Sequence, residues 1–239
     1  MSKRSLDFVL SLFGLIVTAP IWGTFSILIF LQDFHSPFYV APRVGKGGRF
    51  FKMVKLRSMI VGADGSGVDS TSNCDSRITF IGQLVRKLKI DELTQLMNVL
   101  VGDMSLVGPR PNVKRGTDVY TEEEKDILDV QPGITDFSSI VFSDEGFILS
   151  DKQDPDLAYD QLIRPWKSQL CLIYIRNLTM LLDIQIILLT LLALFSKPTA
   201  LGFVVRLLDK LGANEEVKTI ASRSIPLYSI PPPHATQLV

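Results

Sequence analysis

The chain has 239 residues, and its 25 lysine and arginine residues are balanced by 25 aspartate and glutamate residues. This length predicts a single domain with appendages. The zero net charge excludes an overall electrostatic attraction to nucleic acid, so no nucleic-acid partner is expected. The two cysteines, Cys74 and Cys171, lack the spacing of metal ligands, which indicates reduced thiols in a cytosolic setting.

The N-terminal region carries a membrane signal, because residues 8–31 contain no charged side chain. As a helix this stretch would be about 36 Å long, enough to cross a hydrocarbon core of about 30 Å. Lys3 and Arg4 precede it, and six basic residues follow between 43 and 57. Positive residues favour the cytoplasmic side, and a re-entrant hairpin that turns near Pro20 keeps both basic flanks on that side. The hairpin is therefore favoured, and a simple membrane-spanning helix remains the alternative.

Residues 36–59 have the pattern of strands and turns, with a glycine-rich loop at 45–48. That loop lacks the spacing of a phosphate-binding P-loop, so a hairpin turn with a solvated basic face is the favoured interpretation. Residues 60–76 are rich in Gly, Ser, Asp and Thr, which predicts a loop. The spacing of apolar residues then predicts a helix over 77–100.

An adjacent acidic pair, Asp91 and Glu92, falls inside that predicted helix. Downstream, Pro109 and Pro111 restrict the backbone around Arg110, and a pre-organised guanidinium suits bidentate phosphate binding. Anion-binding groups beside paired carboxylates indicate chemistry on a phosphate, with a divalent metal. An exposed acidic pair among lysines is the simpler alternative. Neighbouring helix positions point about 100° apart, so the two carboxylates are expected to have different roles.

The second half is predicted to be mainly helical. Thr121 to Glu124 has the spacing of a capping box and opens a short helix through Leu128, whereas residues 134–149 are predicted to be extended, with a strand at 140–142. The uncharged run 184–195 is too short to span a bilayer and predicts a buried or interfacial helix. Residues 201–211 form an amphipathic pattern suited to the bilayer surface, and the tail from Ser224 is predicted to be disordered or extended.

Several ordered motifs support a resemblance over residues 3–195. They are Lys3-Arg4 with Asp7, Ser36-Pro37, Arg43-Val44-Gly45, Lys55 to Met59, Asp75 with Arg77, Thr79 and Gly82, Asp91 to Leu93 with Gln95-Leu96 and Asn98 to Leu100, Gly102 to Pro111, Pro132 to Thr135, and Asp183-Ile184. In this order and spacing the chain resembles the bacterial sugar transferase family, the monotopic phosphoglycosyl transferases that start membrane-linked glycan assembly.

The resemblance implies an α/β, mostly α, monotopic membrane protein at the cytoplasmic face of the bacterial inner membrane. Residues 1–34 would form a re-entrant helix-break-helix, residues 35–197 the cytosolic catalytic domain with interfacial amphipathic helices, and residues 198–239 an amphipathic helix with an extended tail. The resemblance also implies contact with membrane lipid, interaction with downstream glycosyltransferases and assembly into homo-oligomers.

The implied reaction moves a sugar 1-phosphate from a UDP-sugar to undecaprenyl phosphate with Mg²⁺ as cofactor, releasing UMP in exopolysaccharide, capsule or O-antigen synthesis. By resemblance, Asp91 is the nucleophile of a covalent intermediate, and Asp91 and Glu92 hold the metal. Arg110, flanked by Pro109 and Pro111, binds phosphate. Lys55, Arg57 and Arg86 are secondary phosphate contacts, while Arg77 and Asp103 hold the surrounding structure. A glycosyltransferase that releases UDP and a non-catalytic adaptor are the alternatives.

The chain departs from the family pattern at several positions. Ala19 replaces the serine that commonly precedes the proline of the membrane break, and Thr18 can supply a hydroxyl instead. Near the acidic pair, Lys89 and Thr94 replace a common serine and proline, and Val101 replaces a common lysine. Residues 136–145 differ from the usual continuation after Gly133, which makes this stretch the candidate for sugar discrimination.

Overall fold

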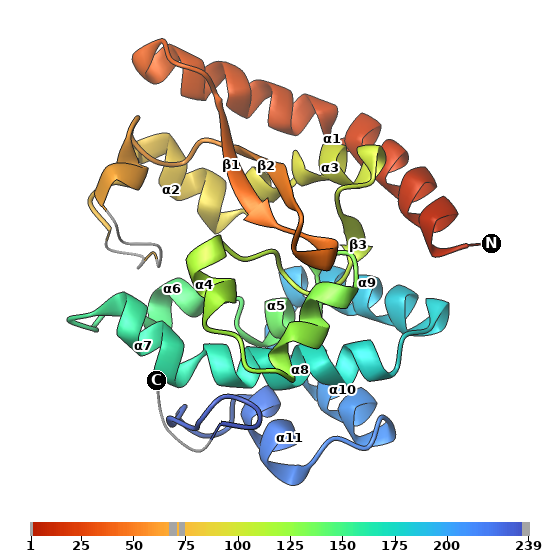
Figure 1. Cartoon of the computed structure of the whole chain (residues 1–239). Helices are drawn as coiled ribbons and strands as arrows, with labels where there is room; N and C mark the ends of the chain where they lie inside the picture. The colour runs from red at the N-terminus through yellow and green to blue at the C-terminus, as the bar shows by residue number, and fades with distance from the viewer. Residues whose placement is uncertain (1, 67–70, 72–74, 236–239) are drawn as a thin grey trace.

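The computed structural model describes residues 2–66, 71 and 75–235. The described chain is mainly helical, with two small sheets between the long first helix and a helical C-terminal half (Figure 1). Cys74 lies outside the described residues. The α-helices are α1 (Lys3–Asp33), α2 (Phe80–Lys87), α3 (Gln95–Val101), α4 (Lys114–Asp118), α5 (Phe137–Val141), α6 (Glu145–Ile148), α7 (Pro155–Leu162), α8 (Arg164–Arg176), α9 (Met180–Phe195), α10 (Lys197–Lys210) and α11 (Glu215–Ser222). The strands are β1 (Phe38–Val44), β2 (Phe50–Leu56), β3 (Ser105–Val107) and β4 (Gly133–Thr135), and short 3₁₀ turns are η1 (Lys46–Gly48), η2 (Ala63–Ser66), η3 (Ile90–Glu92) and η4 (Glu124–Asp129).

Helix α1 is long, apolar and mostly exposed. Within the described residues it is the one helix whose length and composition would allow it to cross a membrane. The predicted helix-break-helix is not confirmed, because Lys3–Asp33 form one continuous helix that includes Pro20. Proline removes the donor that the Ile16 carbonyl would otherwise receive. The Thr18 hydroxyl donates to Gly14 O at 2.7 Å instead, so it does not compensate that carbonyl.

Both ends of α1 are bonded to the same globular body. At the start, the Lys3 ammonium donates to Asp183 at 2.6 Å, and Arg4 donates to the carbonyls of Val99 and Leu100 at the end of α3. At the far end, Asp33 accepts two hydrogen bonds from Arg57. The helix therefore lies across α2 and α3 rather than projecting from the domain (Figure 1).

The glycine-rich loop is a hairpin turn, as predicted. Strands β1 and β2 pair antiparallel, with Val40 opposite Val54, and η1 connects them. Gly47 and Gly48 have φ angles of 66° and 73°, a left-handed conformation that glycine adopts without a steric penalty.

The single helix predicted over 77–100 is wrong. The segment forms α2, the turn η3 and α3, and Lys89 between α2 and η3 adopts a left-handed conformation with φ 57° and ψ 24°. A residue in this conformation cannot continue a right-handed α-helix, so the apolar residues on either side of Lys89 belong to two separate helices. The acidic pair consequently lies in a 3₁₀ turn rather than in a helix.

The second sheet forms because two glycines allow the backbones to touch. Strands β3 and β4 are parallel, Gly108 N donates to Thr135 O at 3.0 Å and Gly133 N donates to Pro109 O at 2.9 Å. A Cβ at Gly133 would lie 2.1 Å from Gly108 N, and a Cβ at Gly108 would lie 2.4 Å from Gln131 O. No side chain fits at either position.

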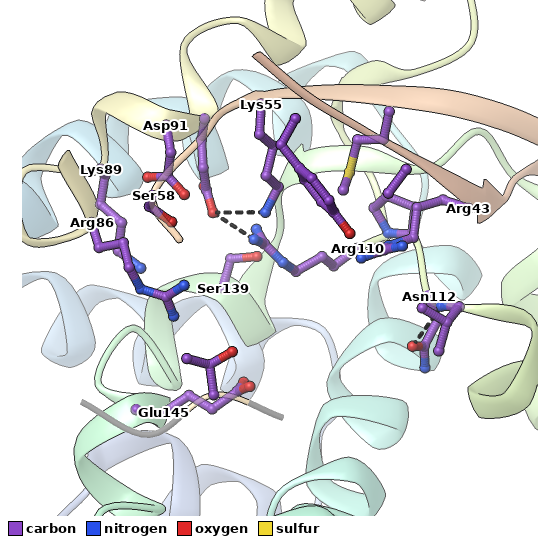
Figure 2. A pocket seen from close by; sticks show the side chains of 18 of the residues that line it. Arg43, Lys55, Ser58, Arg86, Lys89, Asp91, Arg110, Asn112, Ser139 and Glu145 are labelled. Carbon is purple, nitrogen blue, oxygen red and sulfur yellow. Dashed lines mark hydrogen bonds and ion pairs between the residues drawn. The ribbon is translucent and has the colours of Figure 1, made fainter. Parts of the chain in front are cut away.

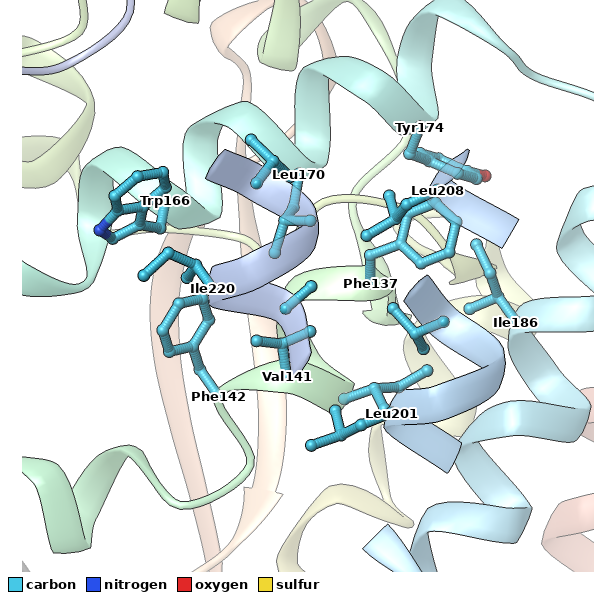
Figure 3. Close-up of a cluster of buried hydrophobic side chains, with 14 of the residues drawn as sticks. Phe137, Val141, Phe142, Trp166, Leu170, Tyr174, Ile186, Leu201, Leu208 and Ile220 are labelled. Atoms are coloured by element: carbon cyan, nitrogen blue, oxygen red, sulfur yellow. The ribbon is translucent and has the colours of Figure 1, made fainter. Parts of the chain in front are cut away.

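The main hydrophobic core surrounds α5. Figure 3 shows Phe137 and Val141 of α5 among buried side chains from α8, α9, α10 and α11. The extended conformation predicted for 134–149 is therefore wrong after Thr135, and the strand predicted at 140–142 is absent, because 137–141 form α5 and 145–148 form α6. The Asp136 carboxylate caps α5 by accepting from Ser139 N. The capping box is confirmed, since Thr121 N donates to Glu124 Oε2 at 2.9 Å and Glu124 N to Thr121 Oγ1 at 3.2 Å, although η4 is a 3₁₀ helix.

The C-terminal residues complete this core. The amphipathic pattern at 201–211 was predicted to lie on the bilayer, but α10 buries Leu201, Val204 and Leu208 against α5 and α9. The described part of the tail is extended, and Tyr228 packs edge-on against Trp166 and accepts its indole N–H at the carbonyl, 3.1 Å away. Helices α10 and α11 and the described tail are thus packed with the rest of the core.

Candidate active site

The acidic pair occupies the turn η3 and has two distinct environments. Asp91 is 9% exposed, and its Oδ1 is buried without a hydrogen-bond partner in the described part of the chain. Glu92 instead forms an ion pair with Arg110 at 2.5 Å and lies 3.9 Å from the Lys55 ammonium. Figure 2 shows Asp91, Lys55 and Arg110 around one pocket, with dashed lines joining the two cations to one carboxylate.

Electrostatics separate the two carboxylates further. Burial and then the neighbouring Glu92 charge raise the pKa of Asp91, against the opposing influence of Lys55 and Arg86. Burial also favours the neutral form of Glu92, but Arg110 and Lys55 outweigh it and hold the pKa of Glu92 well below its usual range. Glu92 is therefore a fixed anion, while the charge of Asp91 responds to nearby cations. The different roles expected for the two residues have this physical basis.

Lys55 and Arg110 are unlike each other as cations. Burial and then the Arg110 charge lower the pKa of Lys55 to about 8, although Glu92 and Asp91 oppose this change. Attraction to Glu92 raises the pKa of Arg110, so its guanidinium is permanently charged. The ammonium of Lys55 thus loses its proton in the mildly alkaline range and gains it again when more negative charge enters the pocket.

The Gly-Pro-Arg-Pro segment is held on both sides. Strand pairing at Gly108 and Gly133 anchors its start, and Val44 N donates to Asn112 O at 2.9 Å just beyond its end. The prolines limit the backbone between these points. This arrangement directs Arg110 toward Glu92, and the flanking Pro109 and Pro111 also line the pocket.

The pocket is a cleft of about 2010 Å³ that is lined by residues from both the N-terminal and the C-terminal half of the chain. Arg86, from the last turn of α2, and Lys89 lie beside Asp91 in it (Figure 2). Within the described residues neither of these two cations forms an ion pair. The structure therefore brings Asp91, Glu92, Lys55, Arg86 and Arg110 together.

Arg57 has a different place from the one predicted. Its guanidinium donates to both carboxylate oxygens of Asp33 at 2.5 and 2.6 Å, and its Nε donates to Ser36 O at 2.8 Å. These contacts occupy a buried side chain that lines the cleft edge. We assign Arg57 to holding the end of α1 on the domain rather than to contacting phosphate.

Two further predicted residues support the surrounding structure. Arg77 binds the carboxylate of Asp75, at 2.6 Å for the shortest contact, and reaches the carbonyl of Ala63. Asp103 lies at the end of α3, where its carboxylate is 3.4 Å from the Asn98 amide. Asn98 was not singled out as a site residue, yet it is buried and joins α3 to β2, accepting from Val54 N at 2.9 Å and donating to Lys52 O at 2.7 Å.

Residues 136–145, where the sequence departs from the family pattern, form one wall of the cleft. Ser139, Phe142 and Glu145 line it, and Lys167 from α8 pairs with Glu145. Sequence reasoning missed Lys167, because nothing near α8 in the sequence connects it with residue 145. Only the tertiary fold, in which α5 packs against α8, brings residues 145 and 167 together.

The donor set limits the metals that the chain alone can hold. Among the described residues no three His, Cys, Asp or Glu side chains lie close enough to form a metal site. The two carboxylates at η3 could hold a cation only together with further ligands, such as the oxygens of a bound phosphate. Chemically, the cleft combines a buried carboxylate with an unbonded oxygen and four neighbouring cationic side chains, which suits attack on a phosphate ester.

The chain is similar to several proteins named as undecaprenyl-phosphate sugar phosphotransferases. A Bacillus subtilis (strain 168) protein named "Putative undecaprenyl-phosphate N-acetylgalactosaminyl 1-phosphate transferase" is 44% identical over 133 residues, 56% of this chain and 70% of the relative. The UDP-N-acetylgalactosamine-undecaprenyl-phosphate N-acetylgalactosaminephosphotransferase of Aeromonas hydrophila is 32% identical over 188 residues, 77% of this chain. The undecaprenyl-phosphate glucose phosphotransferase of Komagataeibacter xylinus is 37% identical over 199 residues, 80% of this chain.

The matched regions cover 41% of the Aeromonas protein and 35% of the Komagataeibacter protein, so these two relatives are much longer than the shared part. The sequence model of the family described as bacterial sugar transferase matches residues 1–197. That match includes α1, the acidic pair, the Gly-Pro-Arg-Pro segment and α9. The chain therefore belongs to the bacterial sugar transferase family.

Proposed function

We propose that the protein is a phosphoglycosyl transferase that moves a sugar 1-phosphate from a UDP-sugar to undecaprenyl phosphate. The observation that carries this proposal is the buried, unbonded oxygen of Asp91 beside the Glu92–Arg110–Lys55 cluster in a large cleft. The names of the relatives support these substrates, because they specify undecaprenyl phosphate together with transfer of a sugar phosphate.

In the proposed mechanism, a carboxylate oxygen of Asp91 attacks the phosphorus that bears the sugar. A bond forms between Asp91 and this phosphorus, the bond to the bridging diphosphate oxygen breaks, and UMP leaves with that oxygen. An oxygen of undecaprenyl phosphate then attacks the same phosphorus and releases the Asp91 carboxylate. The product is undecaprenyl diphospho-sugar, which downstream glycosyltransferases of exopolysaccharide, capsule or O-antigen assembly would extend.

The surrounding cations account for the reactivity of Asp91. An anionic nucleophile is repelled by a diphosphate unless positive groups offset the charge. Arg110, Lys55 and Arg86 line the cleft on the Asp91 side and can bind the phosphate oxygens. Glu92 remains ionised and keeps Arg110 oriented toward the cleft by their ion pair.

The residues of η3 fit a magnesium ion. Mg²⁺ prefers oxygen ligands and is commonly bound by one or two carboxylates together with substrate phosphates. The unbonded Oδ1 of Asp91 is such an oxygen, and Glu92 offers the second carboxylate. We therefore propose that Asp91 and Glu92 hold Mg²⁺, which when bound would offset the charge of the diphosphate and of the departing UMP.

The deciding experiment compares the products of the wild type with those of Asp91→Asn. We expect the purified wild type to release UMP from a UDP-sugar in the presence of undecaprenyl phosphate, and Asp91→Asn to abolish this release. The matched control is Asp118→Asn, which neutralises an exposed carboxylate that pairs with Lys114 and does not line the cleft. Release of UDP would instead support a glycosyltransferase, release of neither nucleotide would support an adaptor, and substantial activity of Asp91→Asn would refute the nucleophile assignment.

We further propose that the protein is monotopic at the cytoplasmic face of the inner membrane. Helix α1 is apolar and exposed, yet Lys3 and Asp33 at its two ends contact the same domain, which a straight span through the bilayer would prevent. Helices α2 and α9 also expose large apolar side chains, such as Phe80 at 84% and Phe195 at 89%. In this proposal Pro20 is the point at which α1 can bend within one leaflet.

Topology mapping tests the membrane proposal. An N-terminal tag and a cysteine introduced at Ile60 should both be reached only from the cytoplasmic side. Impermeant thiol and antibody labelling of spheroplasts, with and without permeabilisation, provides the measurement. A periplasmic tag together with a cytoplasmic residue 60 would refute the monotopic arrangement in favour of a span.

A further inference from the structure

The cleft has two chemically different walls. The wall formed by β2, α2, the N-cap of η3 and the Gly-Pro-Arg-Pro segment carries the cations Lys55, Arg86, Lys89 and Arg110. The opposite wall, formed by α5, α6 and α8, contributes Ser139, Glu145 and Lys167 (Figure 2 shows the first two). A diphosphate is attracted to the excess of cations on the first wall, whereas the mutually paired charges of Glu145 and Lys167 give the second wall no net charge to attract it. The second wall therefore suits an uncharged, hydrogen-bonding part of a ligand.

Ser139 presents an unused hydroxyl to this space. Its backbone N–H donates to Asp136 Oδ1 at 2.7 Å, and the neighbouring Ser138 hydroxyl donates to the same carboxylate at 2.8 Å. The Ser139 Oγ itself is buried and has no hydrogen-bond partner among the described residues. The first turn of α5 thus fixes the backbone of Ser139 while its hydroxyl remains able to donate and to accept.

Glu145 and Lys167 form a polar pair beside it. Lys167 donates to the Glu145 carboxylate and lies 5.2 Å from the centre of the Tyr159 ring. The Glu145 side chain is 31% exposed and that of Lys167 15%, so both remain reachable from the cleft. A carboxylate has several acceptor positions, and one lysine leaves capacity for hydroxyl donors. Lys167 fixes the carboxylate while the remaining acceptor positions face the cleft.

We propose that Ser139 and Glu145, with Lys167 orienting Glu145, bind the hydroxyl groups of the donor sugar and determine which UDP-sugar is used. This inference rests on the proposed function, because it places the sugar opposite the phosphate-binding wall. The ligand class is a hexose with free hydroxyl groups, whose hydroxyls donate to Glu145 and exchange hydrogen bonds with Ser139. Residues 139 and 145 lie in the stretch that departs from the family pattern.

The primary test is a donor-selectivity measurement on the full-length enzyme. UMP release with undecaprenyl phosphate is measured for UDP-glucose, UDP-galactose, UDP-N-acetylglucosamine and UDP-N-acetylgalactosamine. We expect Glu145→Gln and Ser139→Ala to change the ratio of kcat/KM between the preferred donor and its C4 epimer, by on the order of tenfold for Glu145→Gln. A loss of folded enzyme lowers all donors equally and leaves this ratio unchanged. Glu122→Gln, which removes an exposed carboxylate paired with Lys125, is the matched control.

A binding measurement covers the case in which a variant has no turnover. In the Asp91→Asn background, calorimetric titration compares UDP with the preferred UDP-sugar. We expect Glu145→Gln to weaken binding of the UDP-sugar while binding of UDP is unchanged. Equal effects on both ligands, or unchanged donor ratios together with unchanged binding, would overturn the assignment. A wild type that releases no UMP with any donor would refute the proposed function, and the binding comparison would still decide whether these residues contact the sugar.

Discussion

The close contact between Gly108 and Gly133 predicts that Gly133→Ala is strongly destabilising. The added Cβ would lie 2.1 Å from Gly108 N and 2.5 Å from Gly108 O, and both atoms belong to backbone that cannot rotate away. To accept the methyl group, β3 and β4 must separate. Separation breaks the hydrogen bonds from Gly133 N to Pro109 O and from Gly108 N to Thr135 O.

The expected cost follows from these two effects. Each lost backbone hydrogen bond contributes about 1 kcal/mol, and forcing extra volume into a packed site costs about 1–3 kcal/mol. The free energy of unfolding should therefore fall by about 3–5 kcal/mol. For a chain of this size, about 2–4 °C is lost per kcal/mol, so the melting temperature should fall by about 6–20 °C. The same separation moves Pro109 and Arg110, so UMP release should fall more than the folded fraction alone explains.

Thermal unfolding of detergent-solubilised protein, followed by tryptophan fluorescence, measures the effect, because Trp166 is buried in the main core. The matched control is Gly202→Ala in α10, where a Cβ would meet no atom within 4 Å. Alanine is favoured over glycine within helices, so the control should be neutral or slightly stabilised. Equal melting temperatures for the two variants would show that the two strands do not approach as closely as described here.

Three other measurements test the site. The pKa of Lys55 is lowered to about 8, so Lys55 is cationic below this pH and neutral above it. Because a neutral Lys55 no longer attracts phosphate, the KM for the UDP-sugar should rise above pH 8. Lys55→Arg should remove that rise, because arginine stays charged in this range. If the rise persists in Lys55→Arg, another group is responsible. Asn98→Leu leaves Val54 N and Lys52 O without partners and should cost about 2–4 kcal/mol in the free energy of unfolding, measured by the same thermal assay; an unchanged melting temperature would contradict the role of Asn98. Chelation by EDTA should stop UMP release and excess Mg²⁺ should restore it, whereas full activity in EDTA would exclude the proposed metal.

The sequence was most informative where a local rule is sufficient. The hairpin at 45–48 and the capping box at Thr121 depend on residues a few positions apart, and both are present in the structure. The helix predicted over 77–100 failed because the apolar periodicity continues across Lys89, whose left-handed conformation has no signal in that pattern. The amphipathic run at 201–211 was placed on the bilayer, since periodicity identifies an apolar face but not the surface that covers it.

By itself, the sequence determined the family, the apolar first helix, and the acidic pair with its Gly-Pro-Arg-Pro partner, because each of these is written in contiguous residues. The tertiary structure alone decided which cations surround that pair. It turned Arg57 toward Asp33, placed Lys55 and Arg110 at Glu92, and left one oxygen of Asp91 without a hydrogen-bond partner among the residues that the structure describes. These outcomes depend on contacts between residues far apart in the chain, and burial and neighbouring charge exist only after such contacts have formed.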